Sequence, residues 1–158
     1  METLASLSSI ITLEQPDQIG IVVNNVNEMV ASFQSLMGIH GFEIVDWPLQ
    51  NSDPESTYYG KPAYWRMRTA FTTLGNLQIE LIEPLEGQSI YKDFLQKHGP
   101  GIHHFRFTVT NFEDKLEALK KAGIQMIASG RGMRTSSRWA YFDTSEILQG
   151  VFIELRTV

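Results

Sequence analysis

The stretches Gln18-Ile-Gly-Ile-Val-Val23 and His104-Phe-Arg-Phe-Thr-Val109 decide the fold, and they begin 86 residues apart. In each, apolar residues occupy every second position, which predicts a half-buried β-strand. Each stretch is followed by an asparagine, an amphipathic segment with apolar residues at helical spacing, and a terminating glycine, over 25–38 and 111–123. The chain therefore contains the same strand and helix pattern twice.

Three further strand-like segments follow each predicted helix, so each half has the order β-α-β-β-β. They are Gly41–Trp47, Tyr64–Thr73 and Leu77–Ile82 in the first half, and Gln125–Ala128, Arg138–Asp143 and Val151–Arg156 in the second. An internal repeat of this kind indicates two related units packed together. We expect one α+β domain over 1–158, with curved mixed sheets around a cleft. A first βαβββ module at 17–84 and a second at 103–157 are joined at 85–102 by a loop and a short helix, Ser89–Lys97.

Composition restricts the class of protein. The chain has 158 residues, of which 42% are hydrophobic and 20% charged, as is usual for a soluble domain. No apolar run is long enough to cross a membrane, and Glu2 stands where a secretory signal would carry basic residues, so we expect a cytoplasmic protein. The absence of cysteine excludes disulfides, thiolate nucleophiles and cysteine-bound zinc.

Charge is unevenly distributed along the chain. The net charge is −5; residues 1–60 contain eight acidic and no basic residues, and all 13 basic residues follow. No basic stripe typical of nucleic-acid binding is present, so we expect that the protein has no nucleic-acid partner. Arg131, Arg134 and Arg138 form a local basic cluster that suits a small anionic ligand; the alternative is a solvated loop with ordinary surface arginines.

Strand alternation places four polar residues on one face. Where Ile19, Ile21 and Val23 pack beneath the helices, Gln18 faces the other way, and the same reasoning applies to Glu80, His104 and Glu154. His103 then falls on the core side, as a hydrogen-bonded structural histidine. Each of the four residues alone is explained as a polar position on a half-exposed sheet.

The joint placement of these four residues at equivalent positions of the two repeats favours a ligand cluster. One imidazole nitrogen, two carboxylates and one amide oxygen suit a divalent metal ion in expanded coordination, with sites left for water or substrate. We call Gln18, Glu80, His104 and Glu154 the quartet.

The sequence resembles the vicinal oxygen chelate superfamily, which includes glyoxalases, bleomycin-resistance proteins and dioxygenases. Within it the chain is most similar to the methylmalonyl-CoA epimerase family. The resemblance covers most of residues 17–156 and rests on four stretches: Asp17-Gln-Ile-Gly-Ile-Val-Val23, Gly75-Asn-Leu-Gln-Ile-Glu-Leu-Ile-Glu-Pro-Leu85, Ser89-Ile-Tyr-Lys-Asp-Phe-Leu95 and His98-Gly-Pro-Gly-Ile-His-His104.

This resemblance implies a metal-dependent isomerase or epimerase that transfers a proton beside a carbonyl through an enolate. The metal would be Co, Ni, Mn, Zn or Mg, held by the quartet, with Glu154 as the first choice of base and Glu80 as the second. The implied substrate is a small molecule, either an acyl-coenzyme A or an aromatic carbonyl compound, and the fold implies a homodimer.

Two positions depart from the epimerase pattern. Gln18 stands where those enzymes usually have histidine, and no carboxylate lies between Glu55 and Glu80, where their second acid–base group falls. Either a one-base reaction or a different second group, such as Tyr64, would have to replace it. The predicted substrate-binding residues are Tyr64, Arg66, Arg106, Arg131 and Arg138. The aromatic segment 58–68 either lines a pocket or packs at an interface.

Other members of the superfamily give alternative functions. A glyoxalase I-like lyase shares a quartet of this type and order, although Val22 and Pro84 replace the residues that hold glutathione there. A metal-free protein that binds an antibiotic or another small molecule is the alternative from another class. Extradiol dioxygenases generally keep two histidines and a carboxylate for iron, a set that Gln18 breaks.

Overall fold

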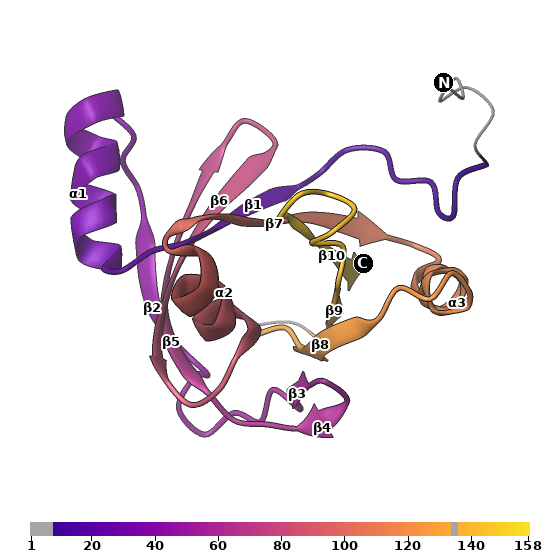
Figure 1. Ribbon diagram of the computed structural model, residues 1–158. Coiled ribbons are helices and arrows are strands. Elements are labelled where there is room, and N and C mark those ends of the chain that lie inside the picture. The colour runs from indigo at the N-terminus through magenta and orange to yellow at the C-terminus, as the bar shows by residue number, and fades with distance from the viewer. Residues whose placement is uncertain (1–7, 134–135) are drawn as a thin grey trace.

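The computed structural model describes residues 8–133 and 136–158, which form one ten-stranded mixed sheet in the order β2-β5-β6-β1-β7-β10-β9-β8-β3-β4 (Figure 1). The strands of the first half are β1 (Gln18–Val22), β2 (Glu43–Trp47), β3 (Thr57–Tyr58), β4 (Lys61–Pro62), β5 (Arg66–Leu74) and β6 (Leu77–Glu86). Those of the second are β7 (Gly101–Val109), β8 (Met126–Arg131), β9 (Arg138–Phe142) and β10 (Phe152–Thr157).

The predicted repeat is confirmed. β1 pairs in parallel with β6, β7 pairs in parallel with β10, and the antiparallel pairing of β1 with β7 joins the two halves. The sheet curls, and this mixed α+β architecture is the expected fold class (Figure 1). Arg134 of the predicted basic cluster lies outside the described residues.

Two helices cover the convex face. Asn25 caps α1 (Val26–Met37) by accepting a hydrogen bond from the Glu28 amide, and Gly38 ends this helix with a positive φ of 65°. α1 packs on Ala70, Ile79 and Leu81. The second helix, α3 (Phe112–Lys121), packs in the same way on β9 and β10. As predicted, Ile19, Ile21 and Val23 lie in the α1 cluster.

The concave face holds the third helix and the largest core cluster. α2 (Ile90–His98) begins after Ser89, which caps it, and lies inside the curve of the sheet (Figure 1). Its Tyr91 and Phe94 pack with Trp47 and Trp65 from the first half and Tyr141 from the second. This cluster therefore holds the two halves together on the concave side of the sheet.

A short hairpin inside the first half was not predicted. No strand was predicted between Trp47 and Tyr64, but β3 and β4 form a hairpin there, and β3 pairs with β8 of the second half. The Thr57 and Ser129 hydroxyls hydrogen-bond at 2.7 Å, and the Tyr58 hydroxyl donates to Asp93 of α2 at 2.6 Å. The hairpin thus extends the sheet beyond β8, and its Tyr58 connects this edge to α2. The strand predicted at Tyr64–Thr73 begins at Arg66, so Tyr64 precedes it.

No helix in the described part of the chain is long and apolar enough to cross a membrane.

Candidate functional site

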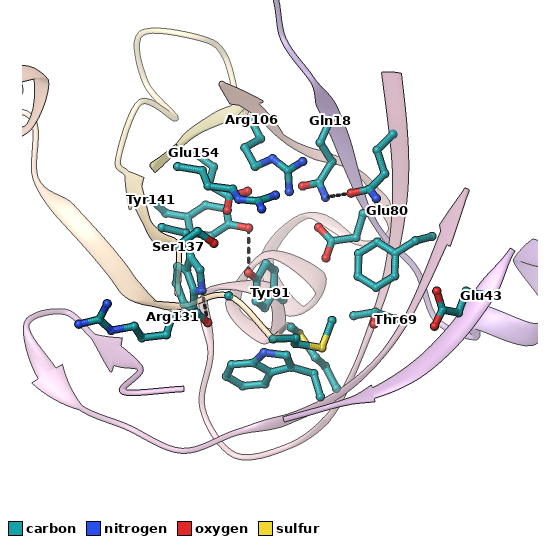
Figure 2. Close-up of a pocket in the computed structure, with 18 residues that line it drawn as sticks. Gln18, Glu43, Thr69, Glu80, Tyr91, Arg106, Arg131, Ser137, Tyr141 and Glu154 are labelled. Atoms are coloured by element: carbon teal, nitrogen blue, oxygen red, sulfur yellow. Dashed lines mark hydrogen bonds between the residues drawn. The ribbon is translucent and has the colours of Figure 1, made fainter. Parts of the chain in front are cut away.

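A cleft of about 250 Å³ lies on the concave face, lined by residues of both halves (Figure 2). Its apolar lining consists of Trp47, Met67, Phe71, Tyr91, Met133, Trp139 and Tyr141. Gln18, Glu80 and Glu154 also line it, and His104 is fully buried behind them. The four residues that alternation assigned to one face therefore gather at one cleft.

Strand register explains this convergence. Gly20 of β1 pairs with both Glu80 of β6 and His104 of β7, which places these three in one row across the sheet. Arg106 of β7 pairs with Gln18 and with Glu154 of β10, which gives the next row on the same face. Since side chains two residues apart share a face, both rows face the cleft.

Three oxygen atoms and the amide group of Gln18, from four strands, surround the Nε2 atom of His104. The distances from this nitrogen are 3.1 Å to the Gln18 amide, 3.4 Å to Glu80 Oε2, 3.3 Å to Glu154 Oε2 and 3.4 Å to the Tyr141 hydroxyl. A single N–H cannot satisfy all of these neighbours. Glu154 Oε2 is buried and contacts His104 as an ion pair, without a hydrogen bond of good geometry in the described residues.

Gly20 makes room for this arrangement. A Cβ atom at position 20 would overlap the imidazole ring of His104, so the ring lies directly against the glycine backbone. The sequence signal was the glycine within an otherwise apolar strand, which marks a close approach of another group. Our reading of the sequence did not use it.

His103 lies on the concave side, which corrects its predicted position on the helix-covered side. The register of β7 shifts opposite Gly20 and Ile21, so His103 is the extra residue of a β-bulge and turns inward beside His104. It is fully buried, and its ring packs against Phe152, Phe94 and Tyr91. Its Nδ1 atom lies 3.0 Å from Nδ1 of His104, so a hydrogen-bonded role is retained.

The electrostatics of the two histidines differ. Burial, with repulsion from His104, lowers the pKa of His103 well below its ordinary value, so this ring is neutral. Burial also disfavours charge on His104, but its interactions with Glu154 and Glu80 prevail and raise the pKa of His104 to about 9. Without a metal ion, the site is therefore an imidazolium between two carboxylates.

Two buried tyrosines complete the lining. Tyr91 donates a hydrogen bond from its hydroxyl to that of Tyr141, at 2.9 Å, and both belong to the cleft wall (Figure 2). Burial, together with Glu80 and Glu154, raises both tyrosine pKa values well above the ordinary range. Both phenols stay protonated at neutral pH and act as hydrogen-bond donors. The sequence reading missed them, because neither lies on the strand faces from which the quartet was identified.

The quartet was tested as a metal site on its donor chemistry. Among residues 8–133 and 136–158, no group of three His, Cys, Asp or Glu side chains is already arranged to bind a metal ion. In the quartet, Glu80 and Glu154 instead contact His104 Nε2 directly. The donors nonetheless fit a divalent cation: two carboxylates balance its charge, and Glu154 Oε2 makes no hydrogen bond beyond its ion pair with His104. In the orientation that satisfies its hydrogen bonds, the Gln18 amide oxygen accepts from Arg106 Nη1 at 3.1 Å and the nitrogen faces Glu80 and His104, so this amide must rotate to offer its oxygen to a metal ion.

The predicted substrate-binding residues separate into two groups. Arg106 and Arg131 line the cleft; Arg106 binds Asp17 at 2.6 Å and Arg131 binds Glu55 at 2.9 Å. The structure places the other three elsewhere. Tyr64 is 64% exposed and borders a separate depression with Arg66, which pairs with Glu86, and Arg138 pairs with Glu113.

Two charged residues of the cleft were missed. Glu43 of β2 lies in one row with Phe71 and Glu80, which places a further carboxylate at the cleft edge. Arg156 lies on β10 two residues after Glu154 and on the same face. For Arg156 the signal was available, because the alternation that placed Glu154 also places residue 156.

Comparisons with known proteins agree with this fold. Residues 17–142 match the sequence profile of the Glyoxalase/Bleomycin resistance protein/Dioxygenase superfamily. The chain is 26% identical over 139 residues to the uncharacterized protein YqjC of Bacillus subtilis, covering 88% of this chain and 89% of that protein. It is 24% identical over 148 residues to the mitochondrial methylmalonyl-CoA epimerase of Homo sapiens, covering 93% of this chain and 76% of that protein.

A solved structure extends the likeness in fold. Methylmalonyl-CoA epimerase from Mycobacterium tuberculosis superimposes with a TM-score of 0.64 at 22% sequence identity, covering 98% of this chain and 95% of that chain. At this identity the similarity concerns the fold.

Proposed function

We propose that this chain, which belongs to the glyoxalase/bleomycin resistance protein/dioxygenase superfamily, is a metal-dependent isomerase or epimerase that moves a proton beside a substrate carbonyl. The observation that supports the proposal is the convergence of two carboxylates, an amide and an imidazole from four strands at one cleft. The human relative named above is an epimerase, which agrees with this reaction class.

The residues proposed to hold the metal ion are Gln18, Glu80, His104 and Glu154, and the candidate ions are Co²⁺, Ni²⁺, Mn²⁺, Zn²⁺ and Mg²⁺. When bound, such an ion supplies Lewis acidity that stabilises negative charge developing on the substrate carbonyl oxygen. His104 offers one lone pair, at Nε2, because its Nδ1 atom faces His103.

Glu154 is the proposed base. Its carboxylate lines the cleft, with His104 Nε2 as its neighbour at 3.3 Å, and a carboxylate held there is able to accept a proton from a substrate carbon. A positioned general base contributes about 10²–10⁴-fold to a rate. Glu80 is the second choice. Epimerisation needs another proton-transfer group on the other side of that carbon, and Glu43 is the further carboxylate of the cleft.

The cleft accepts a small carbonyl group rather than a large ligand. About 250 Å³ is near the lower end of small-molecule sites, so an acyl-coenzyme A would place only its acyl end there. Trp47, Trp139 and Phe71 equally suit a flat aromatic carbonyl compound.

A metal-free binding protein is the second candidate. The observation that favours it is the aromatic lining of the cleft, which suits a small apolar or flat ligand whether or not a metal ion is bound. In that case the aromatic and charged residues of the cleft together would select the ligand.

Metal analysis of the purified protein separates the two candidates. We expect close to one equivalent of metal after loading with each candidate ion, and its loss in His104→Ala. His40→Ala is the matched control, because His40 is exposed and remote from the cleft lining. Failure of every ion to bind would exclude the enolate mechanism and leave the binding protein. Solvent deuterium exchange into small thioesters and keto compounds then tests the reaction.

We also propose a cytoplasmic homodimer, following the resemblance. Light scattering of the purified protein at several concentrations tests the dimer, and fractionation of its native cells tests the location.

A further inference from the structure

Arg156 differs from the other arginines that the structure describes. Arg66, Arg68, Arg106, Arg131 and Arg138 each pair with a carboxylate of the chain, respectively Glu86, Asp46, Asp17, Glu55 and Glu113. Within the same described residues, Arg156 has no ion pair, and its Nε atom is buried without a hydrogen-bond partner. Leaving a buried donor of a charged group unsatisfied is unfavourable.

The unpartnered guanidinium belongs to the cleft. Arg156 lines it and lies two residues beyond Glu154 on β10, so both side chains extend from the concave face. Across the sheet, Arg156 pairs in register with Trp139 of β9, which also lines the cleft. A ligand in the cleft is therefore within reach of both Arg156 and Glu154.

We infer that Arg156 binds a carboxylate of the substrate, so that the substrate is a small carbonyl acid. A guanidinium matches a carboxylate through two parallel N–H···O hydrogen bonds. Resting on the proposed function, this inference assigns the substrate class of the same cleft. Arg131 is a weaker candidate for this role, because Glu55 and the Ser136 carbonyl already accept its hydrogen bonds.

The spacing of Arg156 and Glu154 on β10 favours a carboxylate over the phosphate of a nucleotide tail as the ligand of Arg156. Residues i and i+2 of a strand lie about 7 Å apart, so an anionic group on Arg156 and a carbon facing Glu154 are separated by only a few bonds. The phosphates of coenzyme A lie many bonds from its thioester carbonyl, and the cleft of about 250 Å³ does not hold that whole molecule.

A binding experiment with matched probes tests the inference on the full chain. Quenching of tryptophan fluorescence, to which Trp47 and Trp139 of the cleft contribute, is followed with acetoacetate, 2-oxobutanoate and the methyl ester of each. We expect the acids to bind at least 10-fold more tightly than their esters. Arg156→Gln is expected to weaken acid binding by about 10- to 100-fold, with no effect on the esters.

Two further variants control for fold and charge. Arg68→Gln removes a paired arginine outside the cleft and is expected to leave both affinities unchanged. Arg156→Lys keeps the charge without the planar fork and is expected to give intermediate acid binding. Equal affinity for acid and ester, an acid preference that survives in Arg156→Gln, or no carboxylate-dependent binding by either acid would overturn the inference. Tighter Arg156-dependent binding of inorganic phosphate than of either acid would also overturn it, in favour of a phosphate site.

Metal content distinguishes failure of this inference from failure of the proposed function. A protein that prefers the acids through Arg156 but holds no metal keeps the carboxylate assignment and excludes the isomerase. A protein that holds metal and exchanges substrate protons, yet treats acid and ester alike, excludes the carboxylate assignment alone.

Discussion

The Nδ1 atoms of His103 and His104 lie 3.0 Å apart in adjacent, fully buried rings. Two nitrogens at this separation share one hydrogen, and the neutral ring, His103, is the acceptor. His104 therefore donates through Nδ1 and presents Nε2 to the quartet. In metal sites, a partner of this kind fixes the orientation of the ligating ring.

This relationship predicts that His103 contributes to metal affinity without contacting the metal. His103→Phe keeps an aromatic ring among Phe94, Phe152 and Tyr91 but removes the acceptor. We expect about 10- to 100-fold weaker Co²⁺ or Mn²⁺ binding, measured by titration calorimetry, with an unchanged circular dichroism spectrum. Wild-type affinity in this variant would show that His103 is only a packing residue.

The close packing of His104 against Gly20 predicts that the site cannot accept a larger residue at position 20. In Gly20→Ala the added methyl overlaps the His104 ring, so we expect the ring to be displaced and metal binding to fall by at least about 100-fold. Gly101→Ala is the matched control, because a Cβ atom there meets nothing within 4 Å. The two variants are compared by metal titration and thermal unfolding. Equal metal binding by both would contradict the close packing of His104 on β1.

The proposed role of Glu154 as the base predicts that its substitution causes a loss of proton transfer. Glu154→Gln keeps the size of the side chain and removes the basic oxygen, so we expect solvent deuterium incorporation into a turned-over substrate to fall by about 10²–10⁴-fold. The protein should remain folded, which near-ultraviolet circular dichroism checks. If exchange continued at the wild-type rate, Glu80 would become the base to test.

Asp17 predicts a pH-dependent stability. It accepts hydrogen bonds from Arg106 Nε at 2.6 Å and from the Thr108 amide at 2.7 Å. Partial burial opposes ionisation, but these interactions prevail and lower the pKa of Asp17. A carboxyl with a lowered folded pKa stabilises the protein above its unfolded pKa of about 3.9, and this stabilisation is lost as pH falls through the folded pKa.

Asp17→Asn should therefore lower the free energy of unfolding by about 1–3 kcal/mol at pH 7. The difference from wild type should shrink steadily as the pH falls below about 4. Urea unfolding at a series of pH values measures it. A difference that stayed constant with pH would mean that the substitution acts through packing rather than through the carboxylate charge.

The fold and the quartet could be predicted because both depend on local alternation. A strand has a side-chain period of two, so assigning Ile79 and Leu81 to the core assigns Glu80 to the cleft without any further information. The equivalent positions in the second half gave His104 and Glu154 in the same way. Sequence periodicity carries this information because strand geometry is uniform along each segment.

The features that were missed depend on contacts between distant segments or on local irregularity. Pairing of Tyr58 with Ala128 involves two residues of β3, too few to show a period. His103 is displaced by a β-bulge, which alternation cannot anticipate. Tyr64 was predicted as the first residue of a strand, but β5 begins at Arg66, and before a strand begins the side-chain direction does not follow the period.

The β3–β4 hairpin has a consequence for how the two halves relate. It extends from the first half, yet it pairs with β8 and contacts α2, so the second half lacks an edge partner unless the first half is present. Contacts between residues so far apart in sequence form late and slow folding. Because the two halves complete each other in this way, we expect a fragment that ends after α2 and a fragment that begins at β7 to fold only when mixed.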